Sequence, residues 1–281
     1  MEAVRHWIEK SPYTAALGVE AEEVSAQGVR LALPYREENA NPGKALHGGV
    51  AASLCAIGGQ ALARAALGEE AGPWHTCGLQ VGYLSAAIGE AVTAEARLLR
   101  RGKELCFAEV DVATAEGKPI AHATTTVRGR FGAEAVAAAP LPPDHGESEP
   151  GPMGPHVAKL PFMAGRGIRV EHMTGGTSRL VMPWSEANAD AAGGVHEGAL
   201  LALLDTTGAM ASWAESGPGR YRASTPALQA QVTAVPPRAD LVAYGRCVQR
   251  DGEIFFGAVD VATAPDARLV ARGTVIYRIL T

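Results

Sequence analysis

The chain has 281 residues, of which 47% are hydrophobic and 20% charged, and its formal net charge is −5. This length suits two domains of ordinary size, and the composition is that of a folded protein and not of a disordered one. The negative charge without a sustained basic stripe argues against nucleic acid as the main partner, and the four cysteines contain no C-x-x-C pair that would indicate a zinc site or a disulfide framework.

The N-terminal segment, residues 1–18, mixes charges of both signs and lacks the apolar core and cleavage site of a signal peptide. Together with the cysteine pattern, it predicts a cytoplasmic protein. The most apolar stretch, Ala45–Ala63, has no formal charge but contains a histidine, a serine, a glutamine and four glycines. That mixture favours a buried helix over a membrane span, so no membrane partner is expected.

Five segments of the first half have alternating apolar or β-branched residues between turn signals, which predicts strands. They are Gly28–Pro34, Leu79–Ser85, Ala91–Leu99, Leu105–Thr114 and Ile120–Phe131. Between the first two lies Leu46–Leu67, rich in Ala and Leu, which predicts one long helix that is apolar nearly all round and must be buried. An enclosed helix wrapped by an antiparallel meander is the hotdog arrangement, of class α+β. A doubly wound parallel sheet would need alternating helices and strands that are absent here.

The second half repeats the first at a fixed offset. Residues 107–115 align with residues 256–264, an offset of 149 (256 minus 107) that includes an identical DVATA. The same offset pairs His47 with His196 and needs no gap from residue 11 to about residue 130. It also predicts a second buried helix over Val195–Trp213. A repeat of domain length dictates the architecture, so we expect two tandem hotdog domains packed as a pseudo-dimer.

The domain boundaries follow from composition. Residues 132–159 hold six of the eighteen prolines and a Gly/Glu/Ser mixture without apolar periodicity, which is typical of a linker. The predicted domains are therefore residues 1–131 and 160–281. A linker of this length reaches ~26–31 Å, enough for the two copies to dock side by side.

The residues around the start of each helix differ between the copies. The first copy has His47-Gly48-Gly49, whose free N–H groups at the positive end of a helix dipole could bind a developing oxyanion, and whose glycines allow a close approach of substrate. Nine residues beyond the histidine, the first copy has Ala56 and the second has Asp205. A carboxyl group inside an apolar helix is either a satisfied structural group or a poised base. The histidine, taken alone, is more often a capping or core residue.

Helical geometry excludes a local pairing of His196 with Asp205. Nine residues advance the helix by ~13.5 Å, which places the two side chains far apart and roughly on opposite faces. If the aspartate meets a histidine and an oxyanion site, both must come from the other copy, across the packed interface.

This arrangement resembles the PaaI-like hotdog thioesterases, whose pattern is Asn, five residues, His-Gly-Gly, and an acidic residue eight positions later in the helix. The resemblance spans both copies. It implies that Asn41, His47 and Gly48 of the first copy face Asp205 of the second copy, with Thr225 in the place of the family's strand serine. The reverse combination departs from the family at three positions, where Asp190 replaces the asparagine, Glu197 the first glycine and Ala56 the acid. Without that acid we expect the second position to be inactive or only to bind ligand.

The resemblance also implies the chemistry. The Gly48 N–H and Asn41 would polarise the thioester carbonyl, and Asp205, held by the Thr225 hydroxyl, would act as general base to a water or as nucleophile. His47 would orient groups around the leaving thiol. The expected substrate is an acyl-CoA or a related acyl thioester, with coenzyme A or acyl-carrier protein left open as the carrier. No metal or other cofactor is required, and two tandem chains are expected to associate.

Basic residues at one predicted strand turn have two interpretations. Arg100, Arg101 and Lys103, with Arg250 in the second copy, could contact the phosphates of coenzyme A. A solvated hairpin is the simpler interpretation and the one that we favour. The function has an alternative as well, because the hotdog scaffold also carries hydratases, dehydratases and ligand sensors. The loop motif of the hydratase branches is absent, which leaves a non-catalytic acyl-CoA-binding protein as the second hypothesis.

Overall fold

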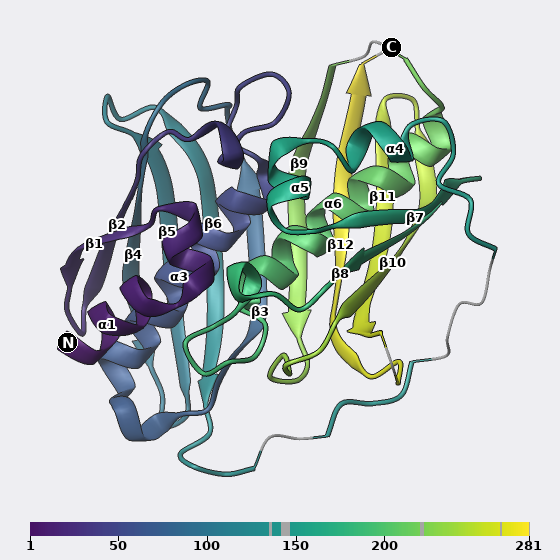
Figure 1. Cartoon of the computed structure of the whole chain (residues 1–281). Coiled ribbons are helices and arrows are strands. Elements are labelled where there is room, and N and C mark those ends of the chain that lie inside the picture. Colours follow the sequence, from purple (N-terminus) through teal and green to yellow (C-terminus); the bar gives the residue numbers. More distant parts are fainter. Residues whose placement is uncertain (135–136, 142–146, 220–221, 265, 281) are drawn as a thin grey trace.

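The computed structural model describes residues 1–134, 137–141, 147–219, 222–264 and 266–280. In each repeat an antiparallel sheet wraps around one long helix, which confirms the α+β tandem arrangement expected from the sequence (Figure 1). The elements of the first repeat are α1 (Glu2–Lys10), α2 (Pro12–Leu17), β1 (Glu20–Val24), β2 (Gly28–Leu33), α3 (Gly48–Leu67), β3 (Trp74–Tyr83), β4 (Val92–Arg101), β5 (Leu105–Thr114) and β6 (Pro119–Gly129).

The second repeat has the same element order. It contains α4 (Gly154–Val157), α5 (Pro161–Gly165), β7 (Arg169–Thr174), β8 (Thr177–Met182), α6 (Glu197–Ser216), β9 (Arg222–Val232), β10 (Leu241–Asp251), β11 (Ile254–Thr263) and β12 (Leu269–Leu280). The offset of 149 residues holds for both ends of the central helix, from Gly48 to Glu197 and from Leu67 to Ser216. The repeat found in the sequence is therefore a repeat of structure.

The two sheets join edge to edge. The combined sheet has twelve strands in the order β1-β2-β4-β5-β6-β3-β9-β12-β11-β10-β8-β7. At the junction β3 pairs antiparallel with β9, and Gln80 lies opposite Gln229, its own counterpart at the offset of 149. A residue that pairs with its own equivalent lies on a twofold axis, so the repeats are related as the subunits of a symmetric dimer are.

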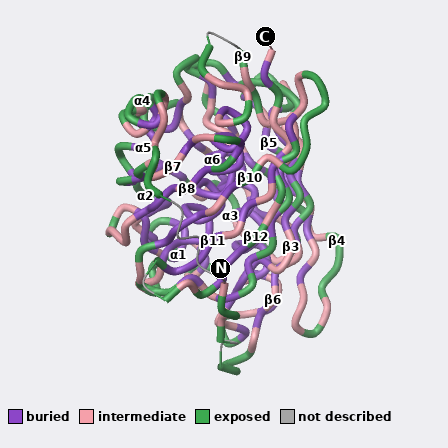
Figure 2. The backbone as a smooth tube through the Cα atoms, turned by 90° about the vertical axis from the view of Figure 1, so that its right-hand side faces the viewer, coloured by how far each residue is buried: buried purple, intermediate pink, exposed green. Residues whose placement is uncertain are grey.

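The central helices α3 and α6 lie together on one face of this sheet (Figure 1). By length and composition α3 could span a membrane, with a mean hydropathy of 1.4, but 89% of that stretch is buried inside the fold. Figure 2 shows the buried backbone concentrated at these helices and the strands around them. The core is therefore shared between sheet and helices, as an all-round apolar helix requires.

Small residues let the two helices approach closely at their N-terminal ends. A Cβ atom on Gly49 would lie 2.7 Å from the Cα atom of Ala202, and one on Gly198 would lie 3.1 Å from the Cβ atom of Ser53. The Ser53 hydroxyl donates to the Gly198 carbonyl oxygen at 2.8 Å. The glycines thus bring the first turn of each helix against the middle of the other, which positions the sites described below.

Most of the predicted linker, residues 132–159, is described by the structure. Residues 135–136 and 142–146 lie outside the described part of the chain. Near its C-terminal end lies α4, which packs against β7 as α1 packs against β1. The structural repeat therefore begins before residue 160, the predicted start of the second domain. This first turn was missed because residues 150–155 contain three prolines and two glycines, which conceal a helix in the sequence.

Candidate functional site

Two related positions lie at the interface of the repeats, one on each side of the pseudo-twofold axis. In the first site, the start of α3 at Gly48 meets Asp205 in the middle of α6. At the second site the equivalent residues, 149 positions away in each direction, are Glu197 and Ala56. The two sites thus have the same backbone and different chemistry.

The start of α3 is fixed by its own histidine. His47 is the N-cap residue, and its Nδ1 atom accepts the Gly49 N–H at 3.1 Å. Its ring stacks on Phe162 of the second repeat, with the centroids 4.4 Å apart. Burial lowers the pKa of His47 to about 4, so the ring is neutral near pH 7. Because Nδ1 accepts a hydrogen bond, the neutral ring carries its proton on Nε2, which is a donor.

Asp205 crosses from the second repeat to this helix start. Its side chain is 3% exposed, and its Oδ1 atom accepts the Thr225 hydroxyl at 3.2 Å. The nearby Gly49 N–H also favours the ionised carboxylate and lowers its pKa. A Cβ atom on Gly48 would lie 2.9 Å from Oδ2, so only glycine at this position leaves room for the carboxylate. The predicted meeting of an acid from one copy with a helix start from the other is present in the structure.

The electrostatics make Asp205 a group that titrates near neutrality. Burial raises its pKa from 3.8 to about 7, and the hydrogen bonds from Thr225 and the Gly49 N–H oppose that rise. A carboxyl group with such a pKa is ionised in a substantial fraction of molecules at pH 7 and can take up a proton there. Asp205 therefore fits both interpretations from the sequence. Its carboxyl group is hydrogen-bonded, as a structural group would be, and its pKa is raised toward neutrality, as that of a general base would be.

Asn41 and Gly49 differ in detail from the predicted arrangement. The Asn41 side chain is half-buried, and its Oδ1 atom accepts the N–H groups of Gly43 at 2.9 Å and Ala45 at 3.1 Å. Its oxygen therefore shapes its own loop, and only its Nδ2 group could donate to a ligand. Gly49 is buried against α6, and its N–H is directed to protein atoms. The Gly48 N–H belongs to the first turn, whose amides have no partner within the helix.

The basic residues that could contact coenzyme A phosphates are exposed on hairpins. Arg100, Arg101 and Lys103 lie at the end of the sheet opposite to the Gly48 end. The start of β4 is level with the Tyr83 end of β3, across the intervening strands β5 and β6, and β4 then runs about 30 Å away from it. Arg250 lies at the same end as Thr225, three strands across the sheet. Its guanidinium donates to the Gly252 carbonyl and covers the Phe255 ring. Only Arg250 is thus at the end of the sheet that holds the first site.

The second site also contains a buried carboxylate, which comes from the start of its helix and not from the middle. Glu197 accepts the Thr76 N–H at 3.2 and 3.1 Å and the Gln60 amide at 2.5 Å. Thr76 is the counterpart of Thr225, so both carboxylates converge on equivalent strand positions. Burial raises the pKa of Glu197 to about 7. A longer acid from the helix start therefore reaches the strand position that the lost helical acid would have reached, and the inactivity of this site stays a prediction.

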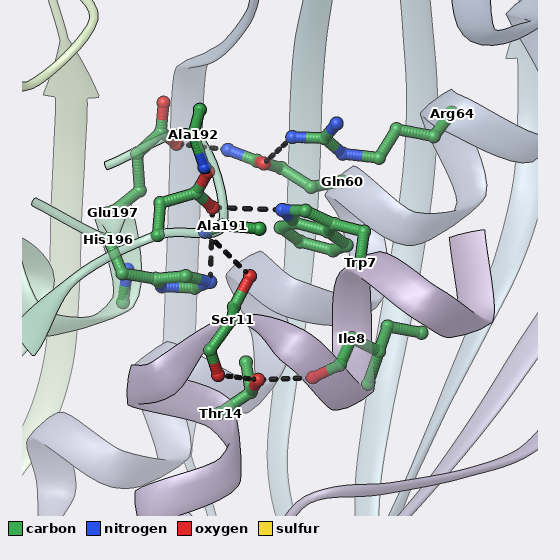
Figure 3. A network of polar contacts seen from close by, with 12 residues as sticks. Trp7, Ile8, Ser11, Thr14, Gln60, Arg64, Ala191, Ala192, His196 and Glu197 are labelled. Atoms are coloured by element: carbon green, nitrogen blue, oxygen red, sulfur yellow. Dashed lines mark hydrogen bonds and ion pairs between the residues drawn. The ribbon is translucent and has the colours of Figure 1, made fainter. Parts of the chain in front are cut away.

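The second site is covered by α1. The Trp7 indole N–H donates to Asp190 at 2.8 Å, and its ring stacks on His196 with the centroids 5.7 Å apart. The Arg64 guanidinium lies 4.1 Å from the centre of the same indole. Figure 3 shows Trp7 lying across the His196 loop, with Gln60 bridging Glu197 and Arg64. His196 is consequently 2% exposed.

Among the residues that the structure describes, none covers the first site as Trp7 covers the second. The counterpart of Trp7 is His156, which is exposed, and His47 is only half-buried. This difference was not predicted from the sequence. The offset of 149 aligns a tryptophan in one repeat with a histidine in the other, and that large change in side chain was a signal that could have revealed it. The sequence analysis also missed Tyr83, whose counterpart is Val232 and whose hydroxyl donates to the Gly48 carbonyl oxygen.

Within the described ranges, no group of three or more His, Cys, Asp or Glu residues could hold a metal ion.

Comparisons with known proteins agree with this architecture. The family described as a domain of unknown function (DUF4442) matches residues 3–128. A "putative esterase" of Halobacterium salinarum is 33% identical over 131 residues, which cover 45% of this chain and 86% of that protein. Both matches are to a segment no longer than one repeat.

Solved structures match over almost the whole chain. A protein of unknown function with hot dog fold from Alicyclobacillus acidocaldarius is 16% identical, with a TM-score of 0.66 over 98% of each chain. The acyl-CoA thioesterase II of Mycobacterium marinum is 12% identical, with a TM-score of 0.63 over 93% of this chain and 96% of that chain. At these identities the likeness shows the fold, which is the hotdog fold in both repeats.

Proposed function

The chain belongs to the hotdog-fold thioesterase superfamily, and on that premise we propose that it hydrolyses an acyl-CoA thioester to the free acid and coenzyme A at the first site. The observation that carries the proposal is the buried Asp205 carboxyl group, which has a pKa of about 7 and lies against the first turn of the opposite helix. An ionisable acid beside the N–H of Gly48, the first amide of the helix, combines a base with a place for an oxyanion. This is the combination that acyl transfer to water needs.

The reaction assigns each group a role. The thioester carbonyl oxygen would accept the Gly48 N–H and the Nδ2 group of Asn41. Asp205, held by Thr225, would take a proton from water as the water oxygen bonds to the carbonyl carbon. The C–S bond then breaks as the tetrahedral intermediate collapses to the free acid, and the leaving thiolate takes the proton that Asp205 had received from water, which restores the carboxylate. The neutral His47, with its proton on Nε2, can donate a hydrogen bond to the leaving sulfur.

The second site is proposed to take no part in turnover. Glu197 has a pKa similar to that of Asp205, but Trp7 covers the approach and Asp190 is hydrogen-bonded to that indole. One chain would thus contain one working composite site.

The test is thiol release from a panel of acyl-CoA and acyl-carrier-protein thioesters by the purified full chain. Asp205→Asn should lower kcat by about 10²–10⁴-fold, the usual contribution of a general base. Wild-type turnover by that variant would refute the assignment. A wild-type chain that binds acyl-CoA in calorimetry without releasing thiol would support the alternative, a non-catalytic acyl-CoA-binding protein.

A single-turnover reaction in H₂¹⁸O separates the two roles open to Asp205. A general base leaves the Asp205 carboxyl group unlabelled, because the labelled water oxygen enters the product acid directly. A nucleophile forms an anhydride with the acyl group, and attack of water on the aspartyl carbon of that anhydride leaves ¹⁸O in Asp205. Mass spectrometry of the peptide that contains Asp205 distinguishes them.

A further inference from the structure

Tyr83 contacts the first turn of α3, the turn that also borders Asp205. It lies at the end of β3, and its hydroxyl donates to the Gly48 carbonyl oxygen at 3.1 Å. That oxygen and the Gly49 N–H belong to the same peptide group. The Gly49 N–H in turn donates to Nδ1 of His47 at 3.1 Å and lowers the pKa of the neighbouring Asp205 carboxyl group. One peptide group therefore connects the tyrosine hydroxyl to the carboxylate.

A hydrogen bond at the carbonyl end of a peptide strengthens its N–H as a donor, because the two bonds polarise the group in the same direction. The Tyr83 hydroxyl thus reinforces the Gly49 N–H, which stabilises the ionised form of Asp205. It also fixes the plane of the peptide and so the direction of the N–H. Both effects act on the acid without contact between the tyrosine and the substrate.

The comparison of the repeats gives independent support. The counterpart of Tyr83 is Val232, which has no hydroxyl, at the site where Glu197 replaces Gly48 and Ala56 replaces Asp205. The hydroxyl is thus present only at the site that has kept the helical acid. A hydroxyl that served the fold alone would be equally useful on both sides of a pseudo-twofold axis.

We propose that Tyr83 is a positioning residue of the first site, whose hydroxyl orients and polarises the Gly48–Gly49 peptide so that its N–H holds Asp205 in the ionised, reactive state. The proposal rests on Asp205 being the acid of the proposed function. It adds a residue that the family resemblance does not contain.

Among the described titratable groups around Asp205, only Asp205 itself changes charge near pH 7. Tyr83 on β3 and Tyr277 on β12 both act on Asp205, and burial raises the pKa of Tyr277 to about 12 and that of Tyr83 well above its usual value. His47 at the start of α3 has a pKa lowered to about 4. Cys55, which acts on Tyr83, has a pKa raised to about 12 by burial. A transition near pH 7 at this site is therefore that of Asp205.

The test is Tyr83→Phe, which removes the hydroxyl and keeps the ring. The matched control is Tyr13→Phe, which removes another buried hydroxyl, bonded to Ser53 at 2.8 Å, from a ring that stacks on His196 at the second site. The first readout is the ¹³C carboxyl shift of Asp205 against pH, identified by its absence in Asp205→Asn. The second is the pH profile of kcat.

In Tyr83→Phe the transition of Asp205 should move upward by roughly 0.3 to 1 pH unit, and kcat below pH 6 should fall by about two- to tenfold and recover above pH 9. Tyr13→Phe should leave both readouts at the wild-type values. An unmoved Asp205 transition in Tyr83→Phe would overturn the proposal, whatever happens to kcat. Because the NMR titration needs no turnover, a wild-type chain without thioesterase activity would refute the proposed function separately.

Discussion

Two buried carboxyl groups with raised pKa values predict that this protein loses stability as the pH rises through neutrality. The pKa of Asp205 is about 7 in the fold and 3.8 in its ordinary state, a gap of about three units. The folded state therefore binds this proton more tightly, so the stabilisation is complete below pH 3.8 and is lost as the pH rises through 7. At ~1.4 kcal/mol per unit, the two units between pH 5 and pH 7 amount to at most about 3 kcal/mol.

The assay is urea unfolding at pH 5, 6, 7 and 8, followed by circular dichroism. Asp205→Asn cannot ionise, so its free energy of unfolding should fall less between pH 5 and pH 8 than that of the wild type, by about 2–3 kcal/mol. Glu197→Gln should behave in the same way, because burial raises the pKa of Glu197 from 4.5 to about 7. Asp251→Asn, at an exposed position, serves as the control. Curves for Asp205→Asn and the wild type that stay parallel over this range would refute the reasoning.

Two further substitutions test the geometry of the two sites. Gly48→Ala places a Cβ atom 2.9 Å from Asp205 Oδ2 and should lower kcat at least about tenfold by displacing the acid, as steady-state thioester hydrolysis would measure; an unchanged kcat would show that the acid has room to move. Trp7→Ala removes the cover of the second site and should cost about 3–5 kcal/mol in urea unfolding, with kcat of the folded protein unchanged. His156→Ala, the same change at the exposed counterpart, should alter neither quantity, and equal losses in the two variants would contradict the asymmetry.

Much of the fold could be predicted because the duplication and the apolar periodicity are local properties of the sequence. The strand Leu105–Thr114 has the predicted bounds, and the helices begin two residues after their predicted starts. The start of β3 at Trp74 was missed, because residues 74–78 lack the alternation that marks the rest of the strand. The short α4 was missed for the related reason that its prolines and glycines break the helical pattern.

The residues that come together in the first site could be predicted from the sequence. The offset of the repeat gives the equivalent positions, and the rise of a helix excludes a pairing of Asp205 with the histidine of its own repeat. The position that the Glu197 carboxylate takes in the fold could not be predicted from the sequence. Its carboxylate binds Gln60 and the Thr76 N–H, groups 137 and 121 residues away, and only the packed interface decides which of them a flexible glutamate reaches. A raised pKa likewise depends on burial, which a sequence indicates only for whole segments.

The fusion of the two repeats explains how such different sites can coexist. In a symmetric homodimer every substitution alters both sites at once. A side chain at the Gly48 position would collide with Asp205, so a glutamate there is compatible only with a site that has lost its helical acid. In the fused chain Glu197 faces the site where Ala56 has replaced that acid, and the glutamate fills the room with its own carboxylate. The two substitutions are therefore coupled. Restoring a helical acid by Ala56→Asp alone would set one carboxylate against another in a buried site, so a second working site requires Glu197→Gly as well.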